Sequence, residues 1–153
     1  MPATSPATTT VPVYAGFGRR VAATLLDAAG PLLLVLLARF VLWLSASNRP
    51  EDEPTMLAVL IAAGLGGLSV LCWVWNQILV QGPTGQSFGK AVLGITLVRV
   101  ADLQPLGAPR AAGRALAQML NSLTLMLGWL AALVDPRRRT LADHLVDTVV
   151  VTR

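Results

Sequence analysis

Two long apolar stretches, residues 21–44 and 55–80, constrain this chain more than any other feature of its sequence. A helix needs about 20 apolar residues to cross a hydrocarbon core roughly 30 Å thick, and both stretches reach that length. The first contains only Asp27 and Arg39 as charged residues, and the second contains none. We therefore expect two transmembrane helices.

The composition argues against a soluble enzyme. Hydrophobic residues make up 54% of the 153 residues and charged residues 13%, whereas a soluble domain carries about 25% charged residues. The single cysteine, Cys72, permits neither an intramolecular disulfide nor a cysteine-based metal site. The net charge is +4, but the basic residues cluster beside the apolar segments and no aromatic residues are interleaved with them. We therefore expect no nucleic-acid binding.

The rest of the chain divides where the composition changes. Residues 1–13 are small, polar and proline-containing, which predicts a disordered tail ahead of one membrane domain at 14–153. After the two helices the domain continues with a Gly- and Pro-rich segment (81–110), a third apolar segment (111–134) and a basic carboxyl-terminal segment (135–153). Runs of β-branched residues predict strands at 95–100 and 148–152. The expected fold is an all-α membrane protein with a small cytoplasmic β element.

The arginines predict how the chain is oriented. Basic residues flank the apolar helices on one side, at Arg19, Arg20, Lys90, Arg99, Arg110 and Arg114, whereas Arg49 stands among acids in the opposite loop. The positive-inside rule therefore places the amino terminus and residues 81–114 in the cytoplasm.

The third apolar segment, 111–134, conflicts with a simple third crossing. Such a crossing would put the basic run 137–139 outside, against the arginine bias. We favour a re-entrant segment that turns near Asn121 and Ser122, because it keeps the two predicted strands on one side, where they could pair. A third full crossing is the alternative.

Asp27 is the most informative residue, since a carboxylate inside an apolar helix costs about 2.5–3.5 kcal/mol on insertion scales. Arg20 lies two helical turns earlier, roughly 10 Å along the axis, so the two side chains should not touch directly. Pro31 cannot donate to the carbonyl of Asp27, and transporters coordinate cations at such broken helices. Asp27 is thus either an ion or proton group, or a packing lock bonded to Asn76, Gln77 or Asn121.

Small residues on the second helix, Ala62/Gly66 and Ala63/Gly67, have the spacing that lets another helix approach closely. The natural partner is the small-residue face of the first helix around Ala22, Ala23 and Ala29. The alternative is that these residues only fill space.

The segment from Gly85 to Lys90 resembles a phosphate-binding loop but lacks its pattern, because Thr84 and Ala91 stand where glycine and Ser/Thr are needed. We interpret it as an interfacial turn, in which Gly85 and Gly89 allow sharp backbone geometry. Lys90 is then free to meet a lipid phosphate or the carboxyl end of a helix.

Near the end of the chain, Asp143, His144 and Asp147 form the one cluster of histidine and acids. A single histidine is thin evidence for a metal site, and we expect a solvated turn in which Asp143 pairs with an arginine of residues 137–139. Ser87 and Cys72 have no matching base nearby in sequence. We expect no enzyme activity, no metal and no cofactor.

Three blocks in order resemble the RDD family of small bacterial membrane proteins: the opening Gly16-Phe-x-Arg-Arg20 with Asp27, the stretch GQSFGKAVLGITLVRV, and the closing RRRTLADHLVDTVVV. The likeness covers about residues 14–151. The arginine and two aspartates that name the family would be Arg20, Asp27 and Asp143. The resemblance implies a suspected role in transport, linked to sodium/proton antiport in at least one member. One departure is His144 and Val146-Asp147, where the family usually has Asp-Leu-Leu-Ala-Gly.

Two functions remain open. The first is transport of a cation or small solute across the bacterial plasma membrane, with Asp27 as the ion or proton group. Three apolar segments are few for a pathway, so this role needs a homo-oligomer. The second is an accessory or scaffold subunit that docks a partner membrane protein, with Asp27 as a packing lock.

Overall fold

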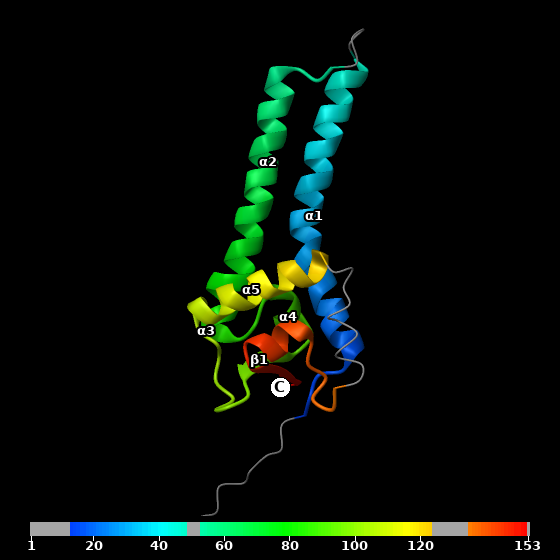
Figure 1. Cartoon of the computed structure of the whole chain (residues 1–153). Coiled ribbons are helices and arrows are strands. Elements are labelled where there is room, and N and C mark those ends of the chain that lie inside the picture. Colours follow the sequence, from blue (N-terminus) through cyan, green and yellow to red (C-terminus); the bar gives the residue numbers. More distant parts are fainter. Residues whose placement is uncertain (1–12, 49–52, 124–134, 153) are drawn as a thin grey trace, which may run out of the picture.

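The computed structural model describes residues 13–48, 53–123 and 135–152, and it has two parts (Figure 1). Helices α1 (Phe17–Ser47) and α2 (Met56–Val74) stand side by side as an antiparallel pair, which we call the hairpin. At its base lies a compact cap, formed by residues 13–16, 81–123 and 135–152. A π-helical turn (Trp75–Val80) and α3 (Gln81–Thr84) connect α2 to the cap.

Both long helices expected from the sequence are present. Among the described residues, Phe17–Ser47 and Met56–Thr84 are the helical stretches long and apolar enough to cross a membrane, with mean hydropathies of 2.1 and 2.3. Their apolar side chains mostly face outward, as Leu33 and Leu71 do with 66% and 65% of their surface exposed. At 31 residues, α1 is roughly 46 Å long, so it exceeds a hydrocarbon core and its first turns lie beside the cap.

The two helices meet through a narrow strip of small residues. Ala58, Ala62 and Ser69 are the buried positions of α2, and the hydroxyl of Ser69 donates to the Pro31 carbonyl of α1 at 3.0 Å. Of the small residues predicted to pack, Ala62 does so, but Ala63 and Gly67 are exposed and a side chain at Gly66 would meet open space. The helix α1 continues through Pro31, so the broken helix considered from the sequence is not formed.

The third apolar segment differs from the expectation. Its first half forms α5 (Ala108–Leu123), which crosses the base of the hairpin instead of running alongside it (Figure 1). In this helix the small residues Ala111 and Ala115 are buried, while the larger apolar residues Leu116 and Met119 are exposed. The turn expected near residues 121–122 is not formed at those two positions, because α5 continues to Leu123. A third spanning helix is not seen, and residues 124–134 lie outside the described part of the chain.

The two predicted strands form and pair. β1 (Ile95–Arg99) and β2 (Thr148–Thr152) are antiparallel, with Ile95 opposite Thr152 and Arg99 opposite Thr148. Short helices precede them, α4 (Phe88–Val92) before β1 and α7 (Leu141–Leu145) before β2. The backbone N–H of Ala15 donates to the Val150 carbonyl at 2.9 Å, so both ends of the described chain lie in the cap.

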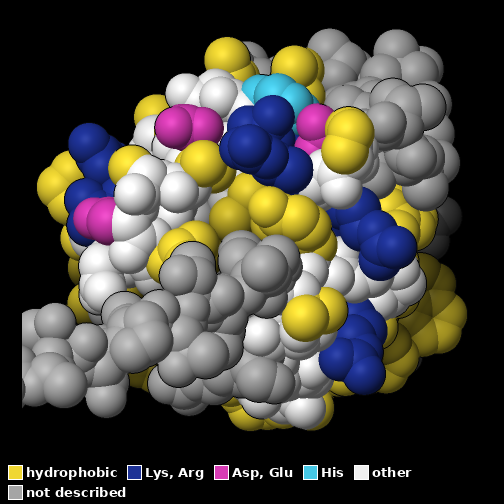
Figure 2. Space-filling view, turned by 90° about the horizontal axis from the view of Figure 1, so that it is seen from below, with side chains coloured by type: hydrophobic (Ala, Val, Ile, Leu, Met, Phe, Trp, Pro, Cys, Tyr) yellow, Lys and Arg dark blue, Asp and Glu magenta, His cyan; other side chains and the backbone are white. Residues whose placement is uncertain are grey.

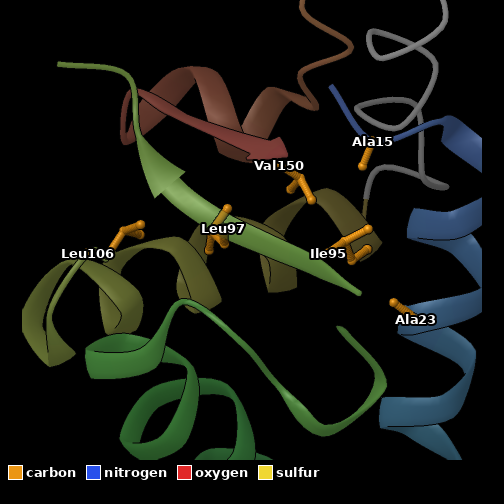
Figure 3. Close-up of a cluster of buried hydrophobic side chains, with 6 residues drawn as sticks. All are labelled: Ala15, Ala23, Ile95, Leu97, Leu106 and Val150. Atoms are coloured by element: carbon orange, nitrogen blue, oxygen red, sulfur yellow. The ribbon is translucent and has the colours of Figure 1, made fainter. Parts of the chain in front are cut away.

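A small apolar core holds the cap against the start of α1. Figure 3 shows its side chains converging from the strand pair, α1 and the segment before α5; they are Ala15, Ala23, Ile95, Leu97, Leu106 and Val150. Each is at most 5% exposed. This core therefore joins the strand pair to the start of α1 and to the segment before α5.

Candidate functional site

Asp27 lies at the base of the hairpin and is 6% exposed. Four hydrogen-bond donors surround its carboxylate. Its Oδ1 accepts from Asn76 Nδ2 at 2.8 Å and from the backbone N–H of Gly89 at 2.7 Å. Its Oδ2 accepts from Ser87 Oγ at 2.5 Å and from Gln77 Nε2 at 3.3 Å. We call this set of five residues the Asp27 node.

The π-helical turn explains how Asn76 and Gln77 reach the same carboxylate. Neighbouring residues on an α-helix point about 100° apart, so both rarely face one group. Asn76 and Gln77 lie in the wider π-helical turn at Trp75–Val80, and there both side chains face Asp27. The Asn76 side chain is also fixed from its other end, because its Oδ1 accepts the backbone N–H of Phe88 at 2.9 Å.

The other two donors depend on a close approach between α4 and α1. A Cβ atom at Gly89 would lie 2.1 Å from the Ala23 carbonyl oxygen, so only glycine fits there. Gly85 ends α3 in the left-handed conformation at φ 72°, and its carbonyl accepts from Leu97 N at 2.7 Å. The two glycines of the predicted interfacial turn thus dock the turn onto α1 and β1.

Two of the partners that the sequence named for Asp27 are found at its carboxylate. Asn76 and Gln77 both donate to it, and Arg20 makes no bond to Asp27, as its two-turn spacing predicted. An ionised carboxylate has about four lone-pair sites, and four neutral donors occupy them here. Little of Asp27 is left for a cation.

Asp143 is the second buried carboxylate, fully enclosed at 0% exposure. Arg20 Nη2 donates to Oδ2 at 2.9 Å, and Arg114 donates to Oδ1 through Nε at 3.0 Å and Nη2 at 2.8 Å. Thr140 caps α7 and its backbone N–H donates to Oδ2 at 3.1 Å. Asp143 with Arg20, Arg114 and Thr140 forms the Asp143 node.

This pairing corrects the prediction that Asp143 binds an arginine of residues 137–139 in a solvated turn. Arg138 contributes only its backbone carbonyl, which accepts from Arg20 Nη1. Burial by itself would raise the pKa of the Asp143 carboxyl, but the charges of Arg114 and Arg20 outweigh it and hold that pKa well below its usual range. Asp143 is therefore a permanent anion that ties α1, α5 and α7 together.

Lys90 lies between the two nodes, and its position corrects the expectation of an interfacial side chain. It is 9% exposed, and its Nζ donates to Gln81 Oε1 and to Ser87 Oγ, the latter at 3.2 Å. Burial, reinforced by the charge of Arg114, lowers the pKa of the Lys90 ammonium to about 7. Ser87 links this ammonium to Asp27 through one hydroxyl.

A cavity of about 100 Å³ separates the two carboxylates. Its wall carries both Asp27 and Asp143 together with the three basic side chains named above. The full lining is Arg20, Thr24, Asp27, Ala28, Trp73, Gln77, Gln81, Lys90, Ala111, Arg114, Ala115, Gln118, Thr140, Asp143 and Val150. The three residues singled out by the RDD resemblance thus line one cavity.

The remaining candidates lie apart from this cavity. His144 is exposed and its Nε2 lies 3.6 Å from Asp135 Oδ1. Within the described residues, no group of three histidine, cysteine or acidic side chains could hold a metal ion. Asp147 adopts the left-handed conformation at φ 49°, which aspartate tolerates, and β2 begins at the next residue. The departure at residues 146–147 therefore leaves the last strand intact.

The sequence analysis did not predict three residues as members of this site: Ser87, Gln81 and Arg114. Arg114 had been used only as a sign of orientation. A signal for it exists, because Ala111, Arg114, Ala115 and Gln118 repeat at the spacing of one helix face, and all four line the cavity. Because residues 111–134 were interpreted as one apolar segment, the face that carries Arg114 and Gln118 was not recognised.

Comparison with known proteins agrees with this arrangement. The family model described as "RDD family" matches residues 14–147, which include the buried arginine and both buried aspartates. The chain belongs to the RDD family. As an RDD-family chain with two long apolar helices, it is a membrane protein.

Relatives of this RDD protein occur in mycobacteria. The "Proline-rich antigen homolog" of Mycobacterium tuberculosis, in strains CDC 1551 / Oshkosh and ATCC 25618 / H37Rv, is 36% identical over 102 residues, which are 65% of this chain and 42% of the relative. The "Proline-rich antigen" of Mycobacterium leprae (strain TN) is 38% identical over 76 residues, 50% of this chain and 30% of the relative. The matched region thus spans less than half of these relatives. No solved structure matches the chain.

Proposed function

We propose that this RDD protein is a non-catalytic accessory or scaffold subunit that docks a partner membrane protein. The carrying observation is the Asp27 node, where four neutral donors from two segments fill one carboxylate. Such a node locks the hairpin to the cap and offers little to a cation. A rigid hairpin with a folded cap is suited to presenting a surface, not to opening and closing a pathway.

The hairpin offers a face on which a second membrane helix could pack. Ala63, Gly64 and Gly67 are exposed on α2, and no atom lies within 4 Å of a Cβ placed at either glycine. Small residues let helices approach closely in lipid, where van der Waals contact drives association. This face is where the proposed partner would bind.

We further propose that the cap lies in the cytoplasm of a bacterial cell, beneath the plasma membrane. Figure 2 views the cap from the end away from the hairpin, and basic side chains gather on that face. Arg110, Arg137 and Arg138 are exposed on the cap, and Arg19 is exposed in the first turn of α1 beside it. This distribution fits the positive-inside rule. Modification of Arg153→Cys by a membrane-impermeant thiol reagent in intact cells would overturn this orientation.

Site-specific crosslinking tests the subunit proposal. In a Cys72→Ser background, Gly67→Cys is joined in native membranes to neighbouring chains, and Leu33→Cys on the exposed side of α1 is the matched control. We expect one constant heterologous adduct from position 67 and none of that mass from position 33. Adducts between copies of this chain alone would contradict the proposal.

Transport of a cation or small solute by an assembly of copies is the second candidate function, with Asp27 as the ion or proton group. One observation favours it: Asp27 forms part of the wall of a cavity that also carries other charged side chains. Ion flux in liposomes that contain only this protein separates the two candidates. Flux by the wild type that disappears in a folded Asp27→Asn variant would replace the subunit proposal with transport.

A further inference from the structure

The cavity between the two carboxylates carries more positive than negative charge. Arg20, Lys90 and Arg114 reach it from α1, α4 and α5, and their side chains are 5%, 9% and 11% exposed. They face two carboxylates, Asp27 and Asp143. Even with both carboxylates ionised, one positive charge remains unbalanced. A buried charge is costly unless it is paired, so this imbalance calls for an anion or for the loss of a proton.

The imbalance centres on Lys90. Asp143 is shared by the two arginines, and Asp27 is filled by neutral donors, so neither carboxylate bonds directly to the ammonium. Lys90 donates to two neutral oxygens, those of Gln81 and Ser87, although an ammonium has three N–H donors. Among the described residues, its third donor has no acceptor.

Arg114 offers a second donor to the same space. It contacts Asp143 through Nε and Nη2, and no described residue accepts from its Nη1. Guanidinium and ammonium groups together form the usual donor set for phosphate oxygens, because both give short, charge-assisted hydrogen bonds. At about 100 Å³, the cavity is several times larger than one water molecule requires.

The opening of the cavity indicates where such a group could come from. Of its lining residues, Thr24 and Ala28 are the exposed ones, and both belong to the part of α1 just above the cap. Trp73, at the base of α2, also lines the cavity. Tryptophan is enriched at the depth of lipid headgroups, so we expect this part of the molecule to lie near lipid phosphates.

We propose that this cavity binds a phosphate group between Lys90 and Arg114, supplied either by a lipid headgroup or by free phosphate. The site is independent of the subunit role, because it requires neither a partner protein nor a second copy. A bound phosphate balances the extra charge and gives both unused donors an acceptor. It also fixes α4 relative to α5, so the ligand stabilises the folded cap.

The pKa of Lys90, about 7, supports the same site. The groups that face this ammonium are Arg20, Arg114, Asp27 and Asp143. An added anion favours the protonated form. Binding should therefore weaken as the pH rises above about 7, since the ammonium then loses its proton.

The test measures thermal unfolding of the full chain in an uncharged detergent at constant ionic strength. The probes are inorganic phosphate and short-chain phosphatidylglycerol, whose phosphodiester does not titrate near neutral pH. Lys90→Gln removes the charge from the cavity, and Arg110→Gln removes an equal charge from the exposed face of α5. We expect the concentration for half-maximal stabilisation to rise about tenfold in Lys90→Gln. In Arg110→Gln it should stay within about twofold of the wild type.

Each outcome has a defined meaning. Stabilisation by phosphatidylglycerol alone identifies a lipid headgroup as the ligand, and stabilisation by both probes identifies the phosphate group itself. If Lys90→Gln does not fold, the wild type still decides, because its stabilisation by phosphatidylglycerol must weaken from about pH 6 to about pH 9. No stabilisation by either probe, or equal losses in the two variants, would overturn the proposal.

Discussion

The two buried carboxylates of this protein are neutralised in opposite ways. The Asp27 node surrounds its acid with amide, hydroxyl and backbone donors, all uncharged. The Asp143 node pairs its acid with two arginines. Asp27 joins the hairpin to the cap where the membrane boundary is expected, whereas Asp143 joins three helices around the cap. The difference teaches that two aspartates of one chain can be buried by different means, one with neutral donors and the other with charged ones.

The largest effect should come from Asp143→Asn. This substitution leaves Arg20 and Arg114 buried without their anion, and breaking a buried pair in this way costs about 3–5 kcal/mol. Thermal or denaturant unfolding in detergent measures the loss. Asp147→Asn is the control, because its side chain is 70% exposed. A loss no larger than that of the control would show that the Asp143 node is not a stabilising contact.

Asp27→Asn should destabilise the protein by roughly 2–6 kcal/mol, a range that overlaps that of Asp143→Asn although only uncharged donors are involved. The amide presents an NH₂ group to donors that already point inward, so about two of the four lose their acceptor at a cost of about 1–3 kcal/mol each. Asp102→Asn, in the exposed turn after β1, serves as the control. An Asp27→Asn protein as stable as the wild type would favour an ion or proton role over a lock.

Gly89→Ala tests the close approach of α4 to α1 and leaves both carboxylates in the sequence unchanged. Its Cβ would clash with the Ala23 carbonyl, so α4 must move and the N–H bond to Asp27 lengthens. Overpacking of this kind costs about 1–3 kcal/mol. Gly113→Ala in α5 meets no atom within 4 Å and should be neutral or slightly stabilising. Equal unfolding temperatures for the two variants would refute the close docking of α4.

The titration of Lys90, the only lysine in the sequence, should give the smallest change in stability per unit of pH. Its folded-state pKa of about 7 lies below the unfolded value near 10.4, so the folded protein releases this proton first as the pH rises. Stability should therefore increase between about pH 7 and pH 10, by at most about 1.4 kcal/mol per pH unit. Denaturant unfolding at several pH values should show this slope in the wild type and not in Lys90→Gln. A slope that persists in the variant would assign the titration to another group.

Local signals in the sequence predicted much of this structure. The length of the two apolar stretches predicted both long helices. The runs of β-branched residues predicted the two strands, which pair with Ile95 opposite Thr152. The same reasoning named Asn76 and Gln77 among the partners of Asp27, because polar residues near the end of an apolar helix need partners at that depth.

Long-range pairing was beyond the sequence. The helix-face spacing places Arg114 beside Ala111 and Ala115, but nothing local identifies its partner. Its bond to Asp143 spans 29 positions, while that of Arg20 spans 123. The burial of Lys90 follows from the docking of α4 onto α1, which depends on the space available at Gly89. Tertiary packing therefore determines which of several similar charged residues form ion pairs, and a single sequence does not show that packing.

The central claim is that Asp27 is a lock filled by protein donors and not a cation site. The most direct measurement compares the unfolding temperature of the wild type in sodium chloride and in choline chloride at equal ionic strength, with Asp27→Asn beside it. A ligand that binds the folded state must stabilise it. Our account predicts the same unfolding temperature for the wild type in both salts. A sodium-dependent stabilisation of the wild type that disappears in Asp27→Asn would contradict it.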